Sequence, residues 1–490
     1  MVLEEAETGD SIGKSEYEQA LPDLRVDLIN IQYELQNAGF PVIVLIGADD
    51  RIGADELIDT LNEWMDARYI DTRWFGRRSE EESERPRFWR YWRELPPKGR
   101  IGVFAGAWAT NPITEQLFGK RDHAFFRRRL EHIRRFEQTL VDDGALLLKF
   151  WLHLPVREHH KRAHAARKHK HKYWKFDQDD WKTYKVLDKV LPLCEELISA
   201  TDTPCCPWQL VETTNSRCRD LTVARSLLRA IRARLDESQP ASPKPVPVPD
   251  EPCCGPLDAV DLGCELEDYN SYKTELRKYQ QKIFRRSEKA ASDGRTSVLV
   301  FEGWDAAGKG GAIRRLTQAM SARNYRVVPI AAPTDEELAH QYLWRFWRQL
   351  PRAGRVLIFD RSWYGRVLVE RVEGYASSEA WQRAYQEIND FEAQLFEYGF
   401  NVQKFWLHID PEEQLRRFKA REKTPYKKYK ITEDDYRNRG KWDAYVCAVN
   451  EMVERTSTDF APWHLVPANS KRYARVQIAR IFSDSLKDGK

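Results

Sequence analysis

The sequence lacks the features of membrane and secreted proteins. Its 490 residues contain no apolar run near the roughly 20 residues that a membrane-spanning helix needs. The first ten residues, MVLEEAETGD, are acidic and polar, without the hydrophobic region of a signal peptide. None of the eight cysteines forms a C-x-x-C pair, so the spacing does not indicate a zinc site. We therefore expect a cytoplasmic protein with reduced thiols and no membrane association.

A large net charge is also missing. The chain has 79 Lys and Arg against 76 Asp and Glu, a formal net charge of +3. This balance argues against a general nucleic-acid-coating protein, so any polyanion site must be a local patch. The length and the 42% of hydrophobic residues suit two or three soluble globular domains.

What the chain does contain is a long internal repeat. The segment RYWRELP at 90–96 recurs as RFWRQLP at 345–351, and FWLHL at 150–154 recurs as FWLHI at 405–409. Each pair is 255 residues apart, as are PWQLV at 207–211 and PWHLV at 462–466. A constant offset indicates a tandem duplication. The first repeat spans residues 12–236 and the second 256–490, and the proline-rich linker at 237–255 favours an extended conformation.

Apolar runs alternate with amphipathic stretches within each repeat. In the second repeat the runs are 298–301, 325–329, 356–359, 402–409 and 463–466, and a long amphipathic stretch covers 381–398. This alternation predicts the α/β class, with a parallel sheet covered by helices on both faces. Phosphates are expected at the carboxyl ends of the strands.

A phosphate-binding loop follows the first of these strands. Residues 298–311 read VLVFEGWDAAGKGG, which contains the pattern G-x-x-x-x-G-K. The pattern predicts backbone N–H groups that surround phosphate oxygens, a positive charge from Lys309, and a helix from about Ala312. Gly310 stands where many such loops carry the Ser or Thr that binds Mg²⁺, so Asp305 is the candidate metal ligand. An ordinary turn-forming role for Asp305 stays open. The candidate phosphate-binding residues of the loop are Gly303, Ala306, Ala307, Gly308, Gly310 and Gly311.

A second candidate metal ligand ends the strand at 356–359. Asp360 follows the strand directly, as a second contact to Mg²⁺ requires, and Arg361 comes next. We expect Arg361 to neutralise a migrating phosphoryl group. A structural ion pair between Arg361 and Asp360 is the alternative.

A basic segment follows the last FWLHI run. Residues 416–430 hold eight Lys and Arg, a density that predicts either a polyanion-binding lid or a solvated helical face. The lid is the favoured interpretation because the segment lies between the last strands of a phosphate-binding fold. Its named candidates are Arg421, Lys427, Lys428 and Lys430.

The first repeat has lost these groups. If Gly47 is matched with Gly303, then Gly53 stands for Lys309 and Ile52 for Gly308. At an offset of 255 residues, Ala105 and Gly106 stand for Asp360 and Arg361, and Ala166 for Arg421. Five histidines between 159 and 171 allow a metal site, but a degenerate lid is the favoured interpretation, because carboxylate partners for metal-bound imidazoles are scarce there. We therefore expect the first repeat to be catalytically inactive.

The motifs of the second repeat closely resemble those of the type-two polyphosphate kinases. They are EGWDAAGKGG at 302–311, FWRQLP at 346–351, FDRSWYGRVLVERV at 359–372 and KFWLHI at 404–409. The degenerate first repeat and the Trp at 304 resemble the two-domain subclass, the polyphosphate:AMP phosphotransferases. The resemblance implies tandem P-loop kinase-like α/β/α domains with a helical lid, two Mg²⁺ ions and a basic channel for polyphosphate, and Mn²⁺ is the alternative ion. It places catalysis on Asp305, Lys309, Asp360, Arg361 and Arg421, the metal on Asp305 and Asp360, and a phosphate or nucleotide contact on Arg366.

The resemblance implies transfer of a phosphoryl group from inorganic polyphosphate to AMP, which gives ADP. The partners are then polyphosphate and AMP or ADP, with no nucleic acid and no membrane. The alternatives are a polyphosphate-dependent nucleoside diphosphate kinase, an ATP-dependent kinase of a small metabolite, and a non-catalytic polyphosphate- or nucleic-acid-binding scaffold. Preference for AMP over GMP and assembly into a homo-oligomer stay open.

Overall fold

The structure is a computed structural model that describes residues 2–119, 122–168, 178–237, 254–423 and 433–487. The chain divides into two compact units. The first comprises residues 1–78, 93–240 and 335–341, and the second comprises 79–92, 241–334 and 342–490. Each unit thus includes a short segment from the other repeat. Within the second unit, for example, the ring of Trp92 stacks on that of Trp347 at 5.8 Å. Residues 238–253 of the predicted linker lie outside the described residues.

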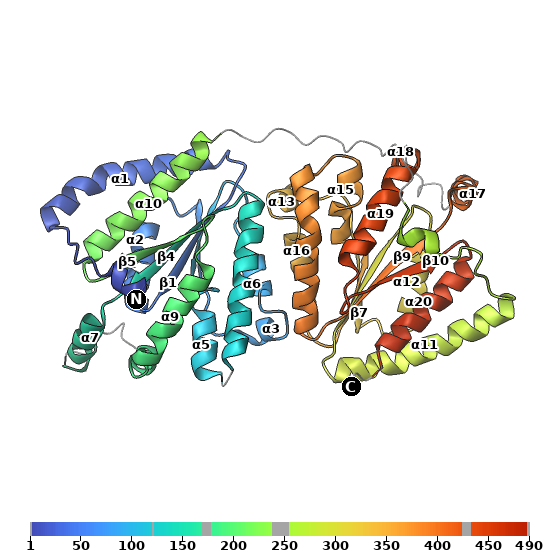
Figure 1. The fold of residues 1–490 in the computed structure, drawn as a ribbon, viewed down its shortest axis with the longest axis horizontal. Coiled ribbons are helices and arrows are strands. Elements are labelled where there is room, and N and C mark those ends of the chain that lie inside the picture. Colours follow the sequence, from blue (N-terminus) through green and yellow to red (C-terminus); the bar gives the residue numbers. More distant parts are fainter. Residues whose placement is uncertain (1, 120–121, 169–177, 238–253, 424–432, 488–490) are drawn as a thin grey trace. The chain divides into compact units, whose positions relative to one another are not determined.

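The first unit is built on a parallel sheet of five strands (Figure 1). The strands are β1 (Val42–Ala48), β2 (Ile70–Trp74), β3 (Ile101–Ala105), β4 (Leu146–His153) and β5 (Trp208–Glu212), in the order β2-β3-β1-β4-β5. One face packs against α1 (Lys14–Leu35), α2 (Arg51–Trp64) and α10 (Ser216–Asp236). The other faces α5 (Asn111–Phe118), α6 (His123–Asp142) and α9 (Leu187–Thr201). Two shorter helices, α7 (Val156–Lys168) and α8 (Gln178–Tyr184), follow β4.

The second unit repeats this plan. Its strands are β6 (Ser297–Gly303), β7 (Tyr325–Pro329), β8 (Val356–Asp360), β9 (Asn401–His408) and β10 (Trp463–Pro467), in the order β7-β8-β6-β9-β10. Helices α11 (Tyr269–Ser292), α12 (Lys309–Thr317) and α20 (Lys471–Ser485) pack together, as do α15 (Val369–Val372), α16 (Ser378–Glu397) and α19 (Trp442–Thr456). Helices α17 (Pro411–Glu422) and α18 (Glu433–Gly440) follow β9. All five predicted strands and the α/β class are confirmed.

The remaining short elements link these layers. They are the helical turns η1 (Val2–Ala6), η2 (Pro256–Ala259) and η3 (Trp363–Arg366), and the short helices α3 (Glu80–Ser83), α4 (Trp89–Glu94), α13 (Asp335–Leu338) and α14 (Trp344–Trp347). No described helix is both long and apolar enough to cross a bilayer.

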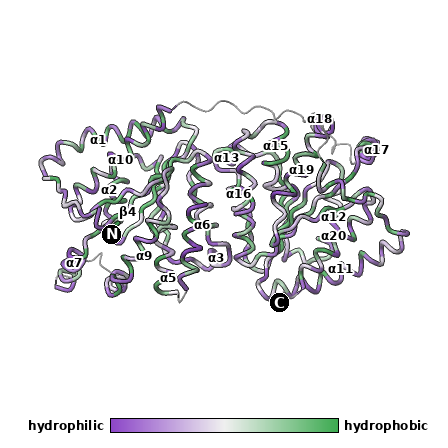
Figure 2. Tube along the Cα trace, viewed as in Figure 1, coloured by the Kyte–Doolittle hydropathy of each residue, from purple (hydrophilic) through white to green (hydrophobic). Residues whose placement is uncertain are grey.

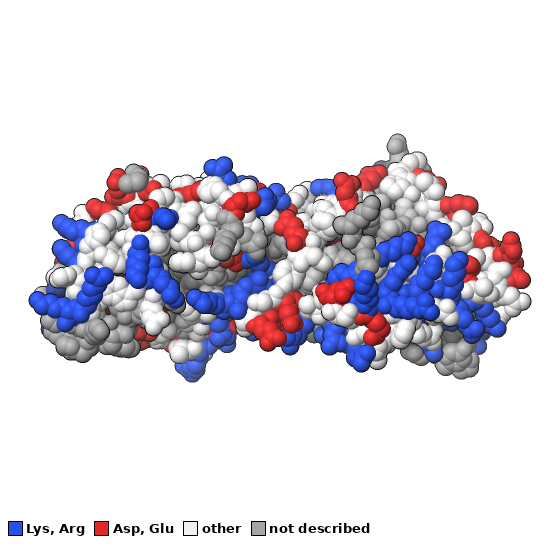
Figure 3. All heavy atoms as spheres, turned by 90° about the horizontal axis from the view of Figure 1, so that it is seen from below, with Lys and Arg blue, Asp and Glu red and all other residues white. Residues whose placement is uncertain are grey.

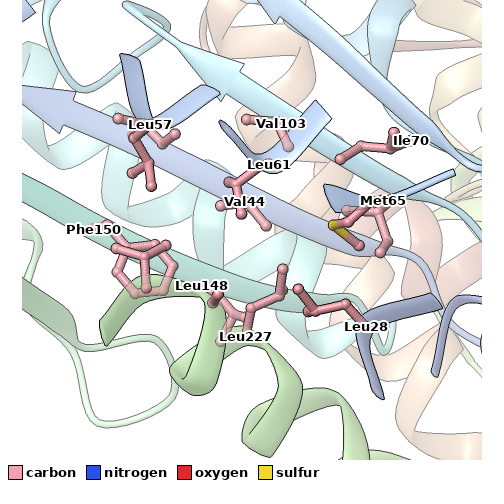
Figure 4. Close-up of a cluster of buried hydrophobic side chains, with 14 of the residues drawn as sticks. Leu28, Val44, Leu57, Leu61, Met65, Ile70, Val103, Leu148, Phe150 and Leu227 are labelled. Atoms are coloured by element: carbon pink, nitrogen blue, oxygen red, sulfur yellow. The ribbon is translucent and has the colours of Figure 1, made fainter. Parts of the chain in front are cut away.

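The hydrophobic residues explain why the central strands lie inside. Residues 42–47 of β1 are all buried, as expected for a parallel strand covered on both faces. Figure 4 shows the core on one face of the first sheet, where Val44 and Val103 of the strands meet Leu57 and Leu61 of α2 and Leu227 of α10. Figure 2 shows hydrophobic residues along the central strands. On the helices, hydrophobic and hydrophilic residues alternate.

The same buried ion pair supports both sheets. Lys149 Nζ lies 2.8 Å from Glu137 Oε2, and the equivalent Lys404 Nζ lies 2.7 Å from Glu392 Oε2. A tryptophan that follows the third strand completes each pair, because Trp108 donates to Glu137 at 2.9 Å and Trp363 donates to Glu392 at 3.1 Å. Both repeats therefore keep the contacts that fix the segment after the third strand, which is β3 in the first unit and β8 in the second.

The cysteines agree only in part with the expectation of reduced thiols. Cys447 is disulfide-bonded, so the expectation is wrong there. Six others are free, namely Cys194, Cys205, Cys206, Cys218, Cys254 and Cys264.

Candidate active site

The glycine loop leaves the carboxyl end of the central strand β6. Gly303 has φ +144°, and a Cβ there would lie 2.6 Å from the carbonyl oxygen of Leu407, so no larger residue fits. Gly308 (φ +117°) and Ala306 (φ +63°) are also left-handed, which bends the chain sharply into α12. The helix begins at Lys309, directly after the left-handed Gly308 and three residues before the predicted start. Gly310 and Gly311 thus lie in its first turn, where N–H groups have no partner within the helix.

Lys309 folds back over this loop. Its Nζ donates to the carbonyl oxygens of Gly303 at 2.6 Å and of Trp304 at 3.2 Å. Burial lowers the pKa of the Lys309 ammonium, and Asp305, Asp360 and Glu302 oppose this shift. The ammonium therefore sits among three carboxylates at the mouth of the loop.

Arg361 pairs with Asp305 rather than with Asp360, the partner considered from the sequence. Its Nη2 lies 3.0 Å from Asp305 Oδ1, and its side chain is 56% exposed. Partial burial lowers the pKa of Arg361, but Asp305, Glu302 and Asp360 outweigh it and the pKa is raised. The backbone of Arg361 is left-handed (φ +66°), a conformation that costs a non-glycine residue about 1–2 kcal/mol.

Asp305 and Asp360 form a donor set that suits Mg²⁺. Asp360 ends β8, and its Oδ2 lies 3.9 Å from the position that a Cβ on Gly310 would occupy, so it faces the start of α12. No group of three or more metal-binding side chains occurs among the described residues. Mg²⁺ commonly takes one or two carboxylates and completes its shell with water and substrate phosphates. The two aspartates therefore fit this ion.

A third acid, Glu302, was not anticipated from the sequence. It is buried beside the loop and accepts a hydrogen bond of 2.7 Å from Ser362 Oγ. Burial raises its pKa. Glu302 directly precedes the glycine motif in the sequence. Its contact with Ser362 becomes visible only in the structure, because β6 and β8 are neighbours in the sheet.

The basic segment divides into two kinds of residue. Arg417 is 2% exposed, and its Nη1 donates to the carbonyl oxygens of Ala306 at 3.0 Å and Ala307 at 2.6 Å. Its Nη2 donates to Ala468 and Asn469. Arg417 thus holds the glycine loop in place, and the solvated-face alternative is wrong for this residue.

The other predicted cations are less fully placed. Arg421 is half-buried in the last turn of α17 and makes no ion pair with the described residues. Lys427, Lys428 and Lys430 lie outside the described residues. Arg366 pairs with Glu370 at 3.2 Å and packs over the ring of Tyr342.

Two basic residues of α20 were missed by sequence reasoning. Lys471 lies beside the glycine loop, with its Cγ 4.0 Å from the position of a Cβ on Gly308, and Arg475 Nη2 lies 3.1 Å from that of Gly311. Burial, with the nearby cations Arg417 and Arg416, lowers the pKa of Lys471 to about 8. Figure 3 shows Lys and Arg side chains gathered densely on one surface of the second unit. The helix that follows the last strand thus adds positive charge to the site.

An aromatic cavity of about 90 Å³, which we call the aromatic slot, adjoins Asp305. Trp304 and Trp442 stack in its wall with ring centres 3.7 Å apart, and the Trp304 indole donates to His408 Nδ1 at 3.0 Å. Burial lowers the pKa of His408 to about 4, so it is the neutral acceptor at pH 7. Asn438 of α18 also lines the cavity and donates to Asp305 Oδ2 at 3.2 Å.

Several buried polar atoms of this cavity make no hydrogen bond to the described residues. Within the described part of the chain, Trp406 Nε1, Tyr445 Oη and Asn438 Oδ1 are buried without a hydrogen bond. Their residues all line the cavity. The slot can therefore stack a flat ring and offer it donors and an acceptor.

The sheets correct the comparison between the two loops. Ile46 pairs with Phe150 and Phe301 pairs with Phe405, so Ile46 is equivalent to Phe301. The match of Gly47 with Gly303 was therefore wrong by one residue. In the correct register Asp50 stands for Asp305, and Ala54 stands for Lys309. The lysine is still lost.

The first repeat fills its own phosphate position. Helix α2 begins at Arg51, and the carboxylate of Asp50 caps it by accepting from the N–H of Gly53 at 3.1 Å. Thr213 Oγ1 donates to Asp50 at 2.7 Å, and Arg162 pairs with it. A carboxylate thus occupies the helix N-terminus where a phosphate would bind.

The adjacent Asp49 is bound just as fully. It accepts from His153 at 2.8 Å and from His159 at 3.2 Å. Burial raises the pKa of Asp49, but these histidines outweigh it and hold the pKa well below its usual range. His159 therefore makes a structural hydrogen bond to a buried carboxylate. His169 and His171 lie outside the described residues.

A glycine loop after the central strand of a parallel sheet, with an acid at the end of the neighbouring strand, defines a P-loop kinase-like phosphotransferase fold. The chain belongs to the polyphosphate kinase 2 family, which matches residues 11–239 and 266–490. Both repeats are thus recognised.

Similar proteins span nearly the whole chain. It is 48% identical to the polyphosphate:AMP phosphotransferase of Pseudomonas aeruginosa, over 99% of this chain and 98% of that protein. It is 36% identical to the protein of the same name from Acinetobacter johnsonii, over 95% of this chain and 96% of that protein. The crystal structure of a putative polyphosphate kinase 2 from Pseudomonas aeruginosa PA01 superposes with a TM-score of 0.87 at 46% identity, covering 99% of this chain and 98% of that one.

Proposed function

We propose that the protein transfers a phosphoryl group from inorganic polyphosphate to AMP, giving ADP, and that the second repeat carries the reaction. The observation that carries the proposal is the grouping of Asp305, Lys309 and Arg361 at a glycine loop, beside an aromatic slot. The relatives named polyphosphate:AMP phosphotransferase support the choice of substrates.

The reaction needs positioning and charge neutralisation more than covalent chemistry. An oxygen of the AMP phosphate forms a bond to the terminal phosphorus of polyphosphate, and the phosphoanhydride bond behind that phosphorus breaks. The shortened polyphosphate keeps the electron pair of that bond. Lys309 and Arg361 neutralise the migrating group, and lid closure brings Arg421 to it. Lys309 must first release the carbonyl oxygens of Gly303 and Trp304.

Asp305 and Asp360 would hold Mg²⁺, with Mn²⁺ as the alternative ion. A bound ion would screen the negative charge of the phosphate oxygens. Asp305 is paired with Arg361 in the structure, and separation of this pair would leave the guanidinium of Arg361 to face the substrate. Asp305 also orients the attacking phosphate of AMP.

The aromatic slot beside Asp305 is proposed as the site of the AMP base. Trp304 and Trp442 offer a flat apolar wall, while Tyr445 and Asn438 offer hydrogen bonds. The stacking of a base on an aromatic side chain is worth about 1–3 kcal/mol. The polyphosphate chain is proposed to run past Lys471 and Arg475 and to contact the basic segment at 416–430, of which 424–430 lie outside the described residues.

The test is to incubate the protein with polyphosphate, Mg²⁺ and one nucleotide at a time, and to separate mono-, di- and triphosphates by chromatography. ADP from AMP is the expected product. Triphosphate formed mainly from diphosphates would favour the nucleoside diphosphate kinase. Product that requires ATP as donor would favour the ordinary small-molecule kinase, and the absence of any product would leave the binding scaffold.

A further inference from the structure

The first repeat retains the aromatic slot's counterpart. The first unit has a cavity of about 210 Å³, and its lining includes the counterparts, 255 positions earlier, of twelve of the fourteen residues that line the slot. Thr183 corresponds to Asn438, Leu187 to Trp442 and Val190 to Tyr445. The same elements, α8 and α9, supply them as α18 and α19 do in the second unit.

This cavity is larger because bulky side chains have been replaced by small ones. Leu187 and Val190 stand where Trp442 and Tyr445 crowd the second slot, and Asp49 stands for Trp304. Decay of a disused site would be expected to close it, since packed interiors leave few voids. Instead the volume is about 210 Å³ against about 90 Å³ in the second repeat.

The charged groups of this cavity are already paired. Asp50 pairs with Arg162, and Arg51 lies 2.5 Å from Asp180. Asp49 accepts hydrogen bonds from two histidines. The helix N-terminus is capped by Asp50, and Ala54 replaces the phosphate-binding lysine. A phosphate in this cavity would meet the carboxylate of Asp50, so the cavity disfavours an anionic ligand.

The remaining lining suits a flat ring that carries polar groups. Ile113, Leu117 and Val190 form apolar walls, and two aromatic residues of the lining, Trp74 and Phe118, are 50% and 54% exposed. Hydroxyl groups come from Thr110, Thr114 and Thr183. Apolar walls with a few polar groups are typical of small-molecule sites.

We propose that the cavity of the first unit binds an uncharged nucleoside. The proposal rests on the proposed function, because it takes the corresponding slot of the second repeat as a nucleoside site. The first repeat has then lost the phosphate-binding half of an ancestral nucleotide site and kept an enlarged base-binding half. The two sites have opposite preferences: the second requires the phosphate of AMP and the first excludes it.

The test is calorimetric titration of the full chain with adenosine and, separately, with AMP. Leu187→Trp, which introduces the residue of the second repeat, fills the cavity, and Val190→Tyr does the same at a second position. Val26→Trp is the matched control, because Val26 is 57% exposed on α1 and does not line the cavity. Thermal unfolding of each variant shows whether it folds.

Wild type and Val26→Trp are expected to bind adenosine, and each cavity-filling variant is expected to bind it at least tenfold more weakly. Adenosine binding should survive saturation with AMP. Equal adenosine affinity in folded Leu187→Trp and Val190→Tyr, or complete displacement by AMP, would overturn the proposal. ADP formation from polyphosphate is measured in parallel. ADP formation without an adenosine site refutes only the nucleoside site, whereas a site sensitive to Leu187→Trp without ADP formation refutes only the proposed activity.

Discussion

The two repeats share one fold, but they differ where the central strand meets the helix that follows it, which is β1 and α2 in the first repeat and β6 and α12 in the second. In the second repeat, strained loop residues precede α12, which begins at Lys309. In the first, α2 begins at Arg51, the counterpart of Ala306, and Asp50 caps it. A side-chain cap is worth about 0.5–2 kcal/mol. The first repeat thus has a capped helix end where the second has a left-handed glycine and no side-chain cap.

The same contrast holds at the end of the third strand. Arg361 is left-handed at φ +66°, and its counterpart Gly106 has φ +62°. The backbone shape is therefore the same, but glycine adopts it without strain. The second repeat thus keeps two strained non-glycine residues, Ala306 and Arg361, at its candidate site, as functional sites commonly do.

The largest effect is expected from removal of the strand-end acid. Asp360→Ala introduces the residue of the first repeat, Ala105, and should lower kcat about a thousandfold or more, because a metal ligand is lost. Asp305→Asn should act similarly. Glu288→Gln, on the far helix α11, is the control in the same steady-state assay. Near-normal turnover in Asp305→Asn would instead support the turn-forming role.

Lys309→Ala tests whether the first repeat works at all. The change copies Ala54 and leaves the first repeat untouched, and we expect kcat to fall about 10²- to 10³-fold, as when one charge-stabilising donor is removed. Chromatography of ADP from polyphosphate and AMP measures it. Activity near the wild-type level would show that the first repeat catalyses the reaction.

Arg361→Gly should separate activity from stability. We expect kcat to fall about a hundredfold, while the second unit gains about 1 kcal/mol because left-handed strain is relieved. The lost pair joins a half-exposed guanidinium to a mostly buried carboxylate, so its loss offsets part of this gain. Urea unfolding followed by tryptophan fluorescence measures the change. The mirror variant Gly106→Arg should destabilise the first unit and leave activity unchanged, and a less stable Arg361→Gly would contradict the strain argument.

Lys471→Ser tests the contribution of α20 to polyphosphate binding. Ser216 is the residue of the first repeat at this position, and its introduction should raise KM for polyphosphate severalfold and make the salt dependence of binding shallower by about one charge. Because the pKa of Lys471 is about 8, the wild-type KM should rise as pH increases through 8 and this charge is lost. Lys471→Arg should keep KM constant over that range. A wild-type profile that is flat through pH 8 would exclude this role.

The smallest effect is expected from restoring the lysine to the first repeat. Ala54→Lys in the Lys309→Ala background should recover no activity, because Asp50 still caps α2 and Ala105 still replaces the strand-end acid. The chromatographic assay of ADP is again the measurement. Recovered turnover would show that the first repeat lacks only its lysine.

Sequence alone was sufficient for the elements whose signal is local. The five strands and the duplication follow from hydrophobic runs and a constant offset, and the glycine loop from its own residues. The start of α12 was placed three residues late, because glycines at 310 and 311 read as loop although they are helical after the left-handed Gly308. The first-repeat loop was matched one residue out of register, because a shared glycine outweighed the sheet pairing that alone decides equivalence.

The sequence by itself determined the duplication, the choice of Asp305, Lys309 and Asp360 as candidate site residues, and the loss of the lysine and the strand-end acid from the first repeat. The tertiary structure decided which groups meet: Arg361 with Asp305, Arg417 with the glycine loop, and Trp304 with Trp442. These partners lie tens of residues apart or more, and helix packing on the sheet sets the direction of each side chain. Local patterns contain no such information, so the open slot of the second repeat and the enlarged cavity of the first emerge only from the folded chain.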